Sequence, residues 1–149
     1  MGPENKQKYL VLIDEELTRK QESLESIEHG RNTAESAMTS HHDHLRSDLA
    51  QDASVVQGII DSFLKFRTFV EQANPSSIIE DGAEFRINLI EEKEEVEGLF
   101  SPVKVSIGNI QIITDQSPIG QAMKGLQVGD VFLYGSRDEL KVGTIEDIK

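Results

Sequence analysis

The segment Thr39-Ser40-His41-His42-Asp43-His44 gathers the residues of this chain that are best suited to chemistry. Imidazole nitrogens and carboxylate oxygens are common protein ligands of first-row metal ions. His44 and Asp48 are four residues apart and would share one face of a helix. Because the chain has no cysteine, thiolate ligands, thiol nucleophiles and disulfides are excluded. Two exposed ligands make a weak site, so we expect no intrinsic metal and a segment whose histidines respond to pH.

Two stripes of apolar residues flank this segment and must position it. Apolar side chains recur at steps of three and four residues from Leu10 to Met38, and again from Leu45 to Val70. This spacing is typical of coiled-coil helices. We therefore expect residues 1–75 to form an antiparallel coiled-coil hairpin with its tip near residues 39–44.

A fold-back at this tip pairs the two stripes in one register. Ile13 then lies opposite Val70, and Arg31 lies opposite Asp52, so that the one acidic position of the second stripe meets a basic residue. Gly30 and Gly58 fall inside the two helices, where glycine costs about 1 kcal/mol relative to alanine. Close packing is the only reason that the sequence offers for them.

Asn74-Pro75 ends the second helix, because proline disfavours a helical conformation in the residue before it. Beyond it, β-branched and alternating stretches predict strands at residues 84–90, 94–105, 107–114, 128–134 and 139–148. A short helix is expected at residues 115–125. The sequence thus predicts an α+β fold in which residues 76–149 form a small antiparallel sheet domain with one helix.

The charge and the hydropathy of the chain restrict its partners. The net charge is −12, with 27 acidic and 15 basic residues, which opposes direct binding to the nucleic-acid phosphate backbone. No segment approaches the roughly 20 apolar residues that a membrane-spanning helix needs. We expect a cytoplasmic monomer that meets nucleic acid only through an electropositive protein partner.

The stretch Ser117-Pro118-Ile119-Gly120-Gln121-Ala122-Met123-Lys124-Gly125, followed by Val128-Gly129-Asp130-Val131, is the most specific motif in the chain. It resembles the C-terminal domain of the bacterial Gre transcript-cleavage factors (GreA/GreB) and their shorter relatives. The resemblance implies an FKBP-like C-terminal domain that docks on RNA polymerase, with Ser117, Pro118, Ile119 and Gly120 as docking candidates. It also implies a coiled coil that enters the secondary channel of the polymerase and acts on elongation or on cleavage of backtracked RNA.

The tip departs from the pattern of this family. Family members commonly read E-H-G-D-L-K-E-N at the tip, where the Asp and the Glu help to hold a Mg²⁺ ion shared with the polymerase active site. Here Glu28-His29-Gly30 is followed by Arg31-Asn32-Thr33-Ala34-Glu35, and neither acid has a counterpart. Asp43 and Asp48 are the remaining candidate acids. The alternatives are an N-cap role for Asp43 and a solvated helix position for Asp48.

Three functions remain open from the sequence. The first is a polymerase-binding factor that is not itself an enzyme and that either promotes cleavage or obstructs the channel. The second is an FKBP-like prolyl isomerase or chaperone, whose pocket would have to come from four aromatic residues, Phe85, Phe100, Phe132 and Tyr134. The third is a coiled-coil adaptor without polymerase activity.

Overall fold

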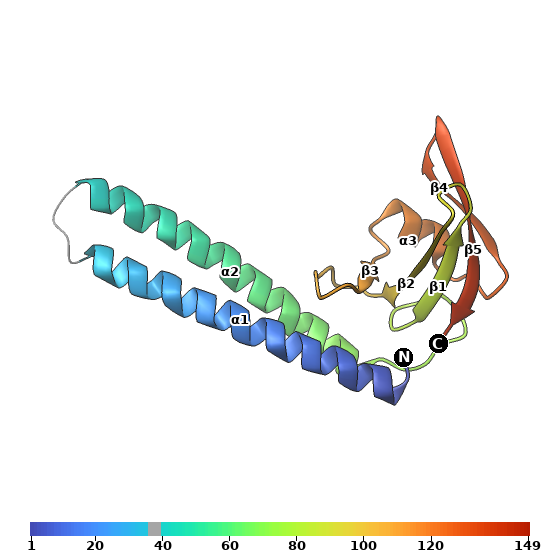
Figure 1. The fold of residues 1–149 in the computed structure, drawn as a ribbon, viewed down its shortest axis with the longest axis horizontal. Coiled ribbons are helices and arrows are strands. Elements are labelled where there is room, and N and C mark those ends of the chain that lie inside the picture. The colour runs from blue at the N-terminus through green and yellow to red at the C-terminus, as the bar shows by residue number, and fades with distance from the viewer. Residues whose placement is uncertain (36–39) are drawn as a thin grey trace.

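The computed structural model describes residues 1–35 and 40–149, and the side chains of residues 31–49 lie outside the described part. Two long helices, α1 (Pro3–Glu35) and α2 (Ser40–Gln72), run side by side in opposite directions as a hairpin. The hairpin projects from a small domain of strands and one short helix (Figure 1). Each helix has 33 residues, so at 1.5 Å per residue the rod is about 50 Å long. The predicted helical hairpin is confirmed.

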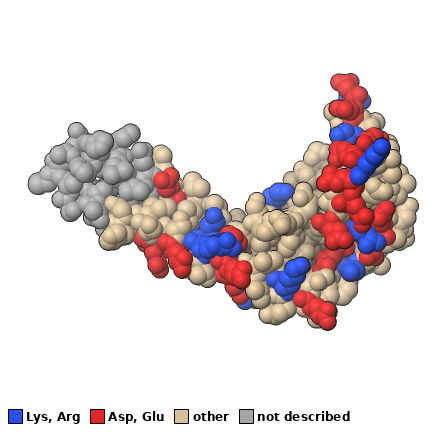
Figure 2. All heavy atoms as spheres, viewed as in Figure 1, with Lys and Arg blue, Asp and Glu red and all other residues tan. Residues whose placement is uncertain are grey.

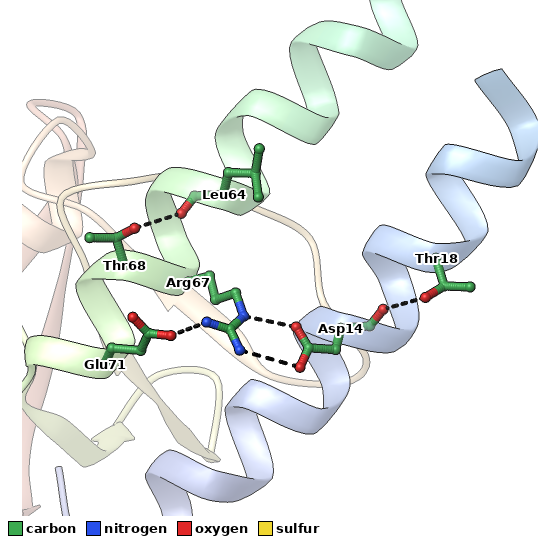
Figure 3. A network of polar contacts seen from close by, with 6 residues as sticks. All are labelled: Asp14, Thr18, Leu64, Arg67, Thr68 and Glu71. Atoms are coloured by element: carbon green, nitrogen blue, oxygen red, sulfur yellow. Dashed lines mark hydrogen bonds and ion pairs between the residues drawn. The ribbon is translucent and has the colours of Figure 1, made fainter. Parts of the chain in front are cut away.

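The lower half of the rod has the predicted register. Ile13 and Val70 are fully buried in one cluster. Beside them, the Arg67 guanidinium donates to Asp14 with a distance of 2.8 Å from Nε to Oδ1, and Arg67 also pairs with Glu71 (Figure 3). These groups are half-exposed and screened by solvent, so the bridge contributes little to stability. Its value lies in aligning the two helices.

Two expectations about the rod are wrong. Asp52 is exposed and Ala53 is buried, so the seam of α2 passes through Ala53 and Ile60 rather than through Asp52. A straight helix drifts by about 20° per heptad against a strict seven-residue repeat, which shifts the seam by one position. Gly58 is exposed and nothing lies within 4 Å of the place where a Cβ would be, so close packing does not explain it. The predicted partner of Asp52, Arg31, lies outside the described side chains.

The second half of the chain is a five-stranded sheet with one short helix, α3 (Pro118–Met123). The strands are β1 (Glu84–Leu89), β2 (Glu94–Phe100), β3 (Gln111–Ile113), β4 (Val131–Ser136) and β5 (Glu139–Ile148), in the order β3-β2-β1-β5-β4. All neighbours are antiparallel except β2 and β3, which run parallel. The predicted α+β fold is confirmed, with a mixed sheet instead of a wholly antiparallel one.

Two strands are shorter than the sequence predicted. β2 ends at Phe100 because Ser101 closes a turn, in which its Oγ both donates to and accepts from the backbone of Val103. β3 begins only at Gln111, after a turn in which Gly108 has a positive φ of 51°. Between these points Val105 and Ile107 are buried, Val103 and Ile110 are partly buried, and none of the four lies in a strand, so burial explains their hydrophobic pattern.

Two hydrophobic clusters hold the protein together. The junction cluster joins the base of the rod to β2, β3 and the loop between them. Its members are Met1, Tyr9, Ile13, Leu17, Ile60, Phe63, Phe66, Val70, Ala73, Leu99, Val105, Ile107 and Ile112. The sheet cluster lies between α3 and the sheet, and its members are Ile79, Ala83, Phe85, Ile87, Leu89, Phe100, Ile113, Met123, Phe132 and Ile145. The division at residue 75 stays a prediction, and the junction cluster crosses it.

Candidate functional site

Helix α3 carries the motif that the sequence singled out, and its first turn is built by that motif. Ser117 has an extended backbone, and its Oγ accepts a hydrogen bond from the Gly120 amide at 3.1 Å. The same hydroxyl donates to the Thr114 carbonyl at 2.9 Å. Pro118 follows in the first turn, where its missing N–H costs nothing because the first amides of a helix have no partner within the helix. The Ser-Pro pair therefore fixes where the helix begins.

Gly120 is required by the approach of the preceding chain. It is buried, and a Cβ added to it would overlap the carbonyl oxygen of Thr114 and lie 2.8 Å from the carbonyl carbon. No rotamer relieves such a clash, because both partners are backbone. Gly120 thus lets α3 pack directly on the end of the strand before it.

The four predicted docking residues differ in what they can offer a partner. Gly120 is buried, Ile119 packs partly against the sheet cluster, and the Ser117 hydroxyl is engaged in the cap. Pro118 is exposed. Of the four, Pro118 therefore has the side chain best placed to contact a partner, and the other three hold it in position.

Three charged residues that the sequence analysis did not identify, Asp81, Asp115 and Lys124, lie beside α3. Lys124 Nζ lies 3.1 Å from Asp115 Oδ2, and this hydrogen bond is the main cause that lowers the pKa of Asp115. Asp81 lies near both. Partial burial, and then the Asp115 carboxylate, raise its pKa. These residues are far apart in sequence, and no spacing pattern connects Asp81 with the motif.

The tip of the hairpin is the second candidate site. Helix α2 begins at Ser40, so His41, His42, Asp43 and His44 follow in its first turns. An N-cap stands before the first helical residue, and these bounds do not fit that role for Asp43. The side chains of these residues and of Asp48 lie outside the described part, so their role as a metal-ligating tip stays a prediction. Glu28-His29-Gly30 lies within α1, below its end at Glu35, as the register predicted.

The described residues do not offer the aromatic pocket that a prolyl isomerase needs. Phe85, Phe100 and Phe132 are each at most 4% exposed and pack in the sheet cluster. Tyr134 is half-buried and its ring lies 5.9 Å from that of Phe132. Phe85 also borders a cavity, but the described residues that line it are mostly charged or polar. These rings therefore do not form an apolar aromatic cleft, which argues against the isomerase alternative.

Within the described residues, no group of three or more His, Asp and Glu side chains is placed to hold a metal ion. The same part of the chain contains no helix with the length and apolar character to cross a membrane. What stands out is therefore the architecture, a long helical rod fixed to a small α+β domain that presents Pro118.

The chain was compared with protein-family models, with curated proteins and with solved structures, and only the solved structures are similar to it. Neither a protein-family model nor a curated protein matches the sequence. The similar solved structures include the transcription factor Gfh1 (18% identity, TM-score 0.41, covering 93% of this chain and 92% of that chain). They also include Gfh1 of Thermus thermophilus (19%, 0.40, 94% and 94%) and the elongation factor GreA/GreB from Nitrosomonas europaea (17%, 0.40, 83% and 91%).

Proposed function

We propose that this chain is a transcription factor that binds bacterial RNA polymerase, inserts its helical hairpin into the secondary channel, and modulates elongation or cleavage of backtracked RNA. The observation that carries the proposal is the motif that begins at Ser117, which resembles the Gre C-terminal domain. In this protein the capping of α3 and the packing of Gly120 account for the first residues of the motif, Ser117 to Gly120. The proposal further assigns a cytoplasmic monomer without catalytic activity of its own.

The rod supports the proposal because it is long and its base is held in place. Ile13 and Phe66 of the rod are fully buried in the same cluster as Leu99 and Ile107 of the sheet domain. Burial of large apolar side chains on both sides of a junction resists bending there. A rod about 50 Å long with a fixed base can carry its tip to a site far from the docked domain.

The net charge of the protein also supports binding to a polymerase channel. At a net charge of −12, the rod and the domain are attracted to an electropositive channel and repelled by RNA itself. At the tip, a carboxylate of Asp43 or Asp48 would supply a hard oxygen ligand to a Mg²⁺ ion that the polymerase binds. The factor would then lend a ligand to an active site that belongs to its partner.

The deciding experiment is an RNA-cleavage assay on a backtracked bacterial polymerase complex, with and without this protein. Asp43→Asn and Asp48→Asn test the tip, and Asp61→Asn is the matched control, because Asp61 is an exposed acid lower on the same helix. Faster cleavage that a tip variant loses and the control keeps would identify a ligand donor. Suppression of cleavage by an authentic Gre factor would identify a channel-blocking regulator. No effect in either assay, together with no binding to the polymerase, would refute the proposal.

Docking is tested separately by measuring polymerase binding of Pro118→Ala. Alanine is tolerated in the first turn of a helix, so stability should change little while affinity falls by roughly tenfold. Gln121→Ala, an exposed position on the same helix, is the control and should bind as the wild type does. If Pro118→Ala binds the polymerase as tightly as Gln121→Ala and the wild type, Pro118 is not part of the docking surface.

A further inference from the structure

The outer face of the sheet, opposite the sheet cluster, meets the rod at Leu99 and Ile112 in the junction cluster. The rest of this face has a charged part and an apolar part. In the charged part, Arg86 Nε lies 3.0 Å from Glu95 Oε1 and 3.7 Å from Glu146 Oε2. In the apolar part, Val131 is 61% exposed, and Leu133 and Leu140 are each 57% exposed. Soluble proteins seldom leave neighbouring large apolar side chains this open without a partner.

The strand register places these apolar residues side by side. Leu133 pairs with Val142 and Gly135 with Leu140 across β4 and β5. The Ile90 amide donates to the Val142 carbonyl at 3.0 Å, which brings Ile90, itself 50% exposed, to the same face. Because side chains alternate along a strand, Phe132 points to the opposite face and is buried there. The apolar face, defined as Ile90, Val131, Leu133, Leu140 and Val142, is thus continuous.

The apolar face ends at an open edge of the sheet. β4 is the last strand in the sheet order, and among the described residues no strand pairs with its outer side. The sequence of β4 is VFLYGS, which contains neither a charge nor a proline. Natural edge strands usually carry Lys or Pro, or are very short, to prevent pairing with other chains. The opposite edge follows that rule, since β3 has only three residues.

Charges around the edge indicate what kind of strand would fit. Asp130, Asp138 and Glu139 lie at the two ends of β4 and its hairpin, and Figure 2 shows acidic side chains at the projecting end of that hairpin. Two basic residues lie nearby. Lys141 is paired with Glu92 at 2.8 Å, and Arg137 stands in the hairpin turn beside Asp138, so the acids at the ends of β4 still outnumber the bases there. A second copy of this chain would bring the same acids together and add another net charge of −12. A basic segment would be attracted instead.

We propose that β4 binds an extended segment of a partner protein as an additional strand, and that this segment has apolar residues at every second position and basic residues at its two ends. The backbone of β4 supplies hydrogen bonds along the open edge, and the apolar face receives every second side chain of the segment. The basic residues of the segment meet the acids at the ends of β4. α3 packs against β4 on the side of Phe132, whereas the apolar face lies on the opposite side of the sheet and away from the rod. The inference therefore does not depend on the proposed function.

The test begins with a library of short random peptides displayed on phage and selected on the full-length protein. The consensus peptide is then synthesised and titrated while backbone amide signals are followed by NMR. The edge variant is Val131→Lys, which adds the charge that natural edges carry. Its matched control is Val55→Lys, because Val55 is 63% exposed and lies on the rod. A version of the peptide with N-methylated amides tests whether backbone pairing is needed.

We expect a consensus with apolar residues at every second position and basic residues at its ends, and signal changes concentrated in β4. Affinity should fall at least about tenfold in Val131→Lys and with N-methylation, and should be unchanged in Val55→Lys. Failure to select any peptide, or a consensus that maps to another surface, would overturn the proposal. A concentration-dependent dimer that Val131→Lys converts to a monomer would overturn it as well, because a second copy would then occupy the edge.

Discussion

The junction cluster and the sheet cluster bury their side chains to a similar degree, but they differ in how far apart their members lie in the sequence. The sheet cluster is drawn from residues 79–145, whereas the junction cluster joins residues 1–73 to residues 99–112. In the rod, Phe63 serves both the helix seam and the contact with the sheet domain. A heptad pattern predicts that a side chain such as Phe63 is buried, but it does not show whether the other helix alone or also the sheet domain buries it.

The largest expected effect is at the junction cluster. Phe66→Ala removes a fully buried ring and should destabilise the protein by about 3–5 kcal/mol. Leu64→Ala is the control, since Leu64 lies on the same helix and is 46% exposed. The measurement is denaturant unfolding followed by helical circular dichroism and by NMR signals from β3. Because the cluster includes Ile112, both signals should shift together, and a shift of the helical signal alone would show that the rod unfolds independently of the sheet.

In the sheet cluster the corresponding test concerns the close contact between α3 and the Thr114 backbone. Gly120→Ala should cost about 1–3 kcal/mol, because the added methyl group overlaps the Thr114 carbonyl and α3 must move. Loss of thermal stability with a displaced Met123 signal would agree with this reasoning. A neutral result would mean that α3 can shift without cost and that the conformation of the motif is less constrained than its contacts indicate.

In the rod, a glycine-to-alanine substitution should change the free energy of unfolding in the opposite direction. Gly58→Ala should stabilise the protein by about 1 kcal/mol, because Gly58 lies inside a helix and open space surrounds its Cα. Thermal unfolding of the two alanine variants side by side therefore compares the two regions directly. Destabilisation by Gly58→Ala would point to a local bend of α2 that depends on glycine.

Local patterns were sufficient to predict the rod, the sheet domain and the cap of α3. The Ser-Pro pair specifies a helix start through contacts within four residues, so Ser117 could be assigned from sequence. The position of the seam at Ala53 could not be assigned from sequence, because it depends on how far each helix rotates away from a strict seven-residue repeat. Asp81 near Asp115 and the apolar face at Leu133 arise from chain segments that only the fold brings together. At the tip, the side chain of Asp43 is not described, and its role rests on sequence alone.

The smallest expected effect is electrostatic and compares two carboxylates beside α3. The pKa of Asp81 is raised above its ordinary value of 3.8, so its ionised form destabilises the fold, and stability falls as pH rises through the pKa of the folded state. Asp81→Asn should therefore stabilise the protein at neutral pH, by less than about 1 kcal/mol because the group is exposed, and the gain should vanish near pH 3.

Asp115 provides the opposite case. Its pKa is lowered, chiefly by the hydrogen bond from Lys124, so its contribution to stability is present above pH 3.8 and is lost as pH falls through the lowered pKa. Asp115→Asn should then weaken the fold slightly at neutral pH. Thermal unfolding of both variants between pH 2 and pH 7 tests the pair. Shifts of the same sign would contradict burial as the main cause for Asp81 or the Lys124 hydrogen bond as the main cause for Asp115.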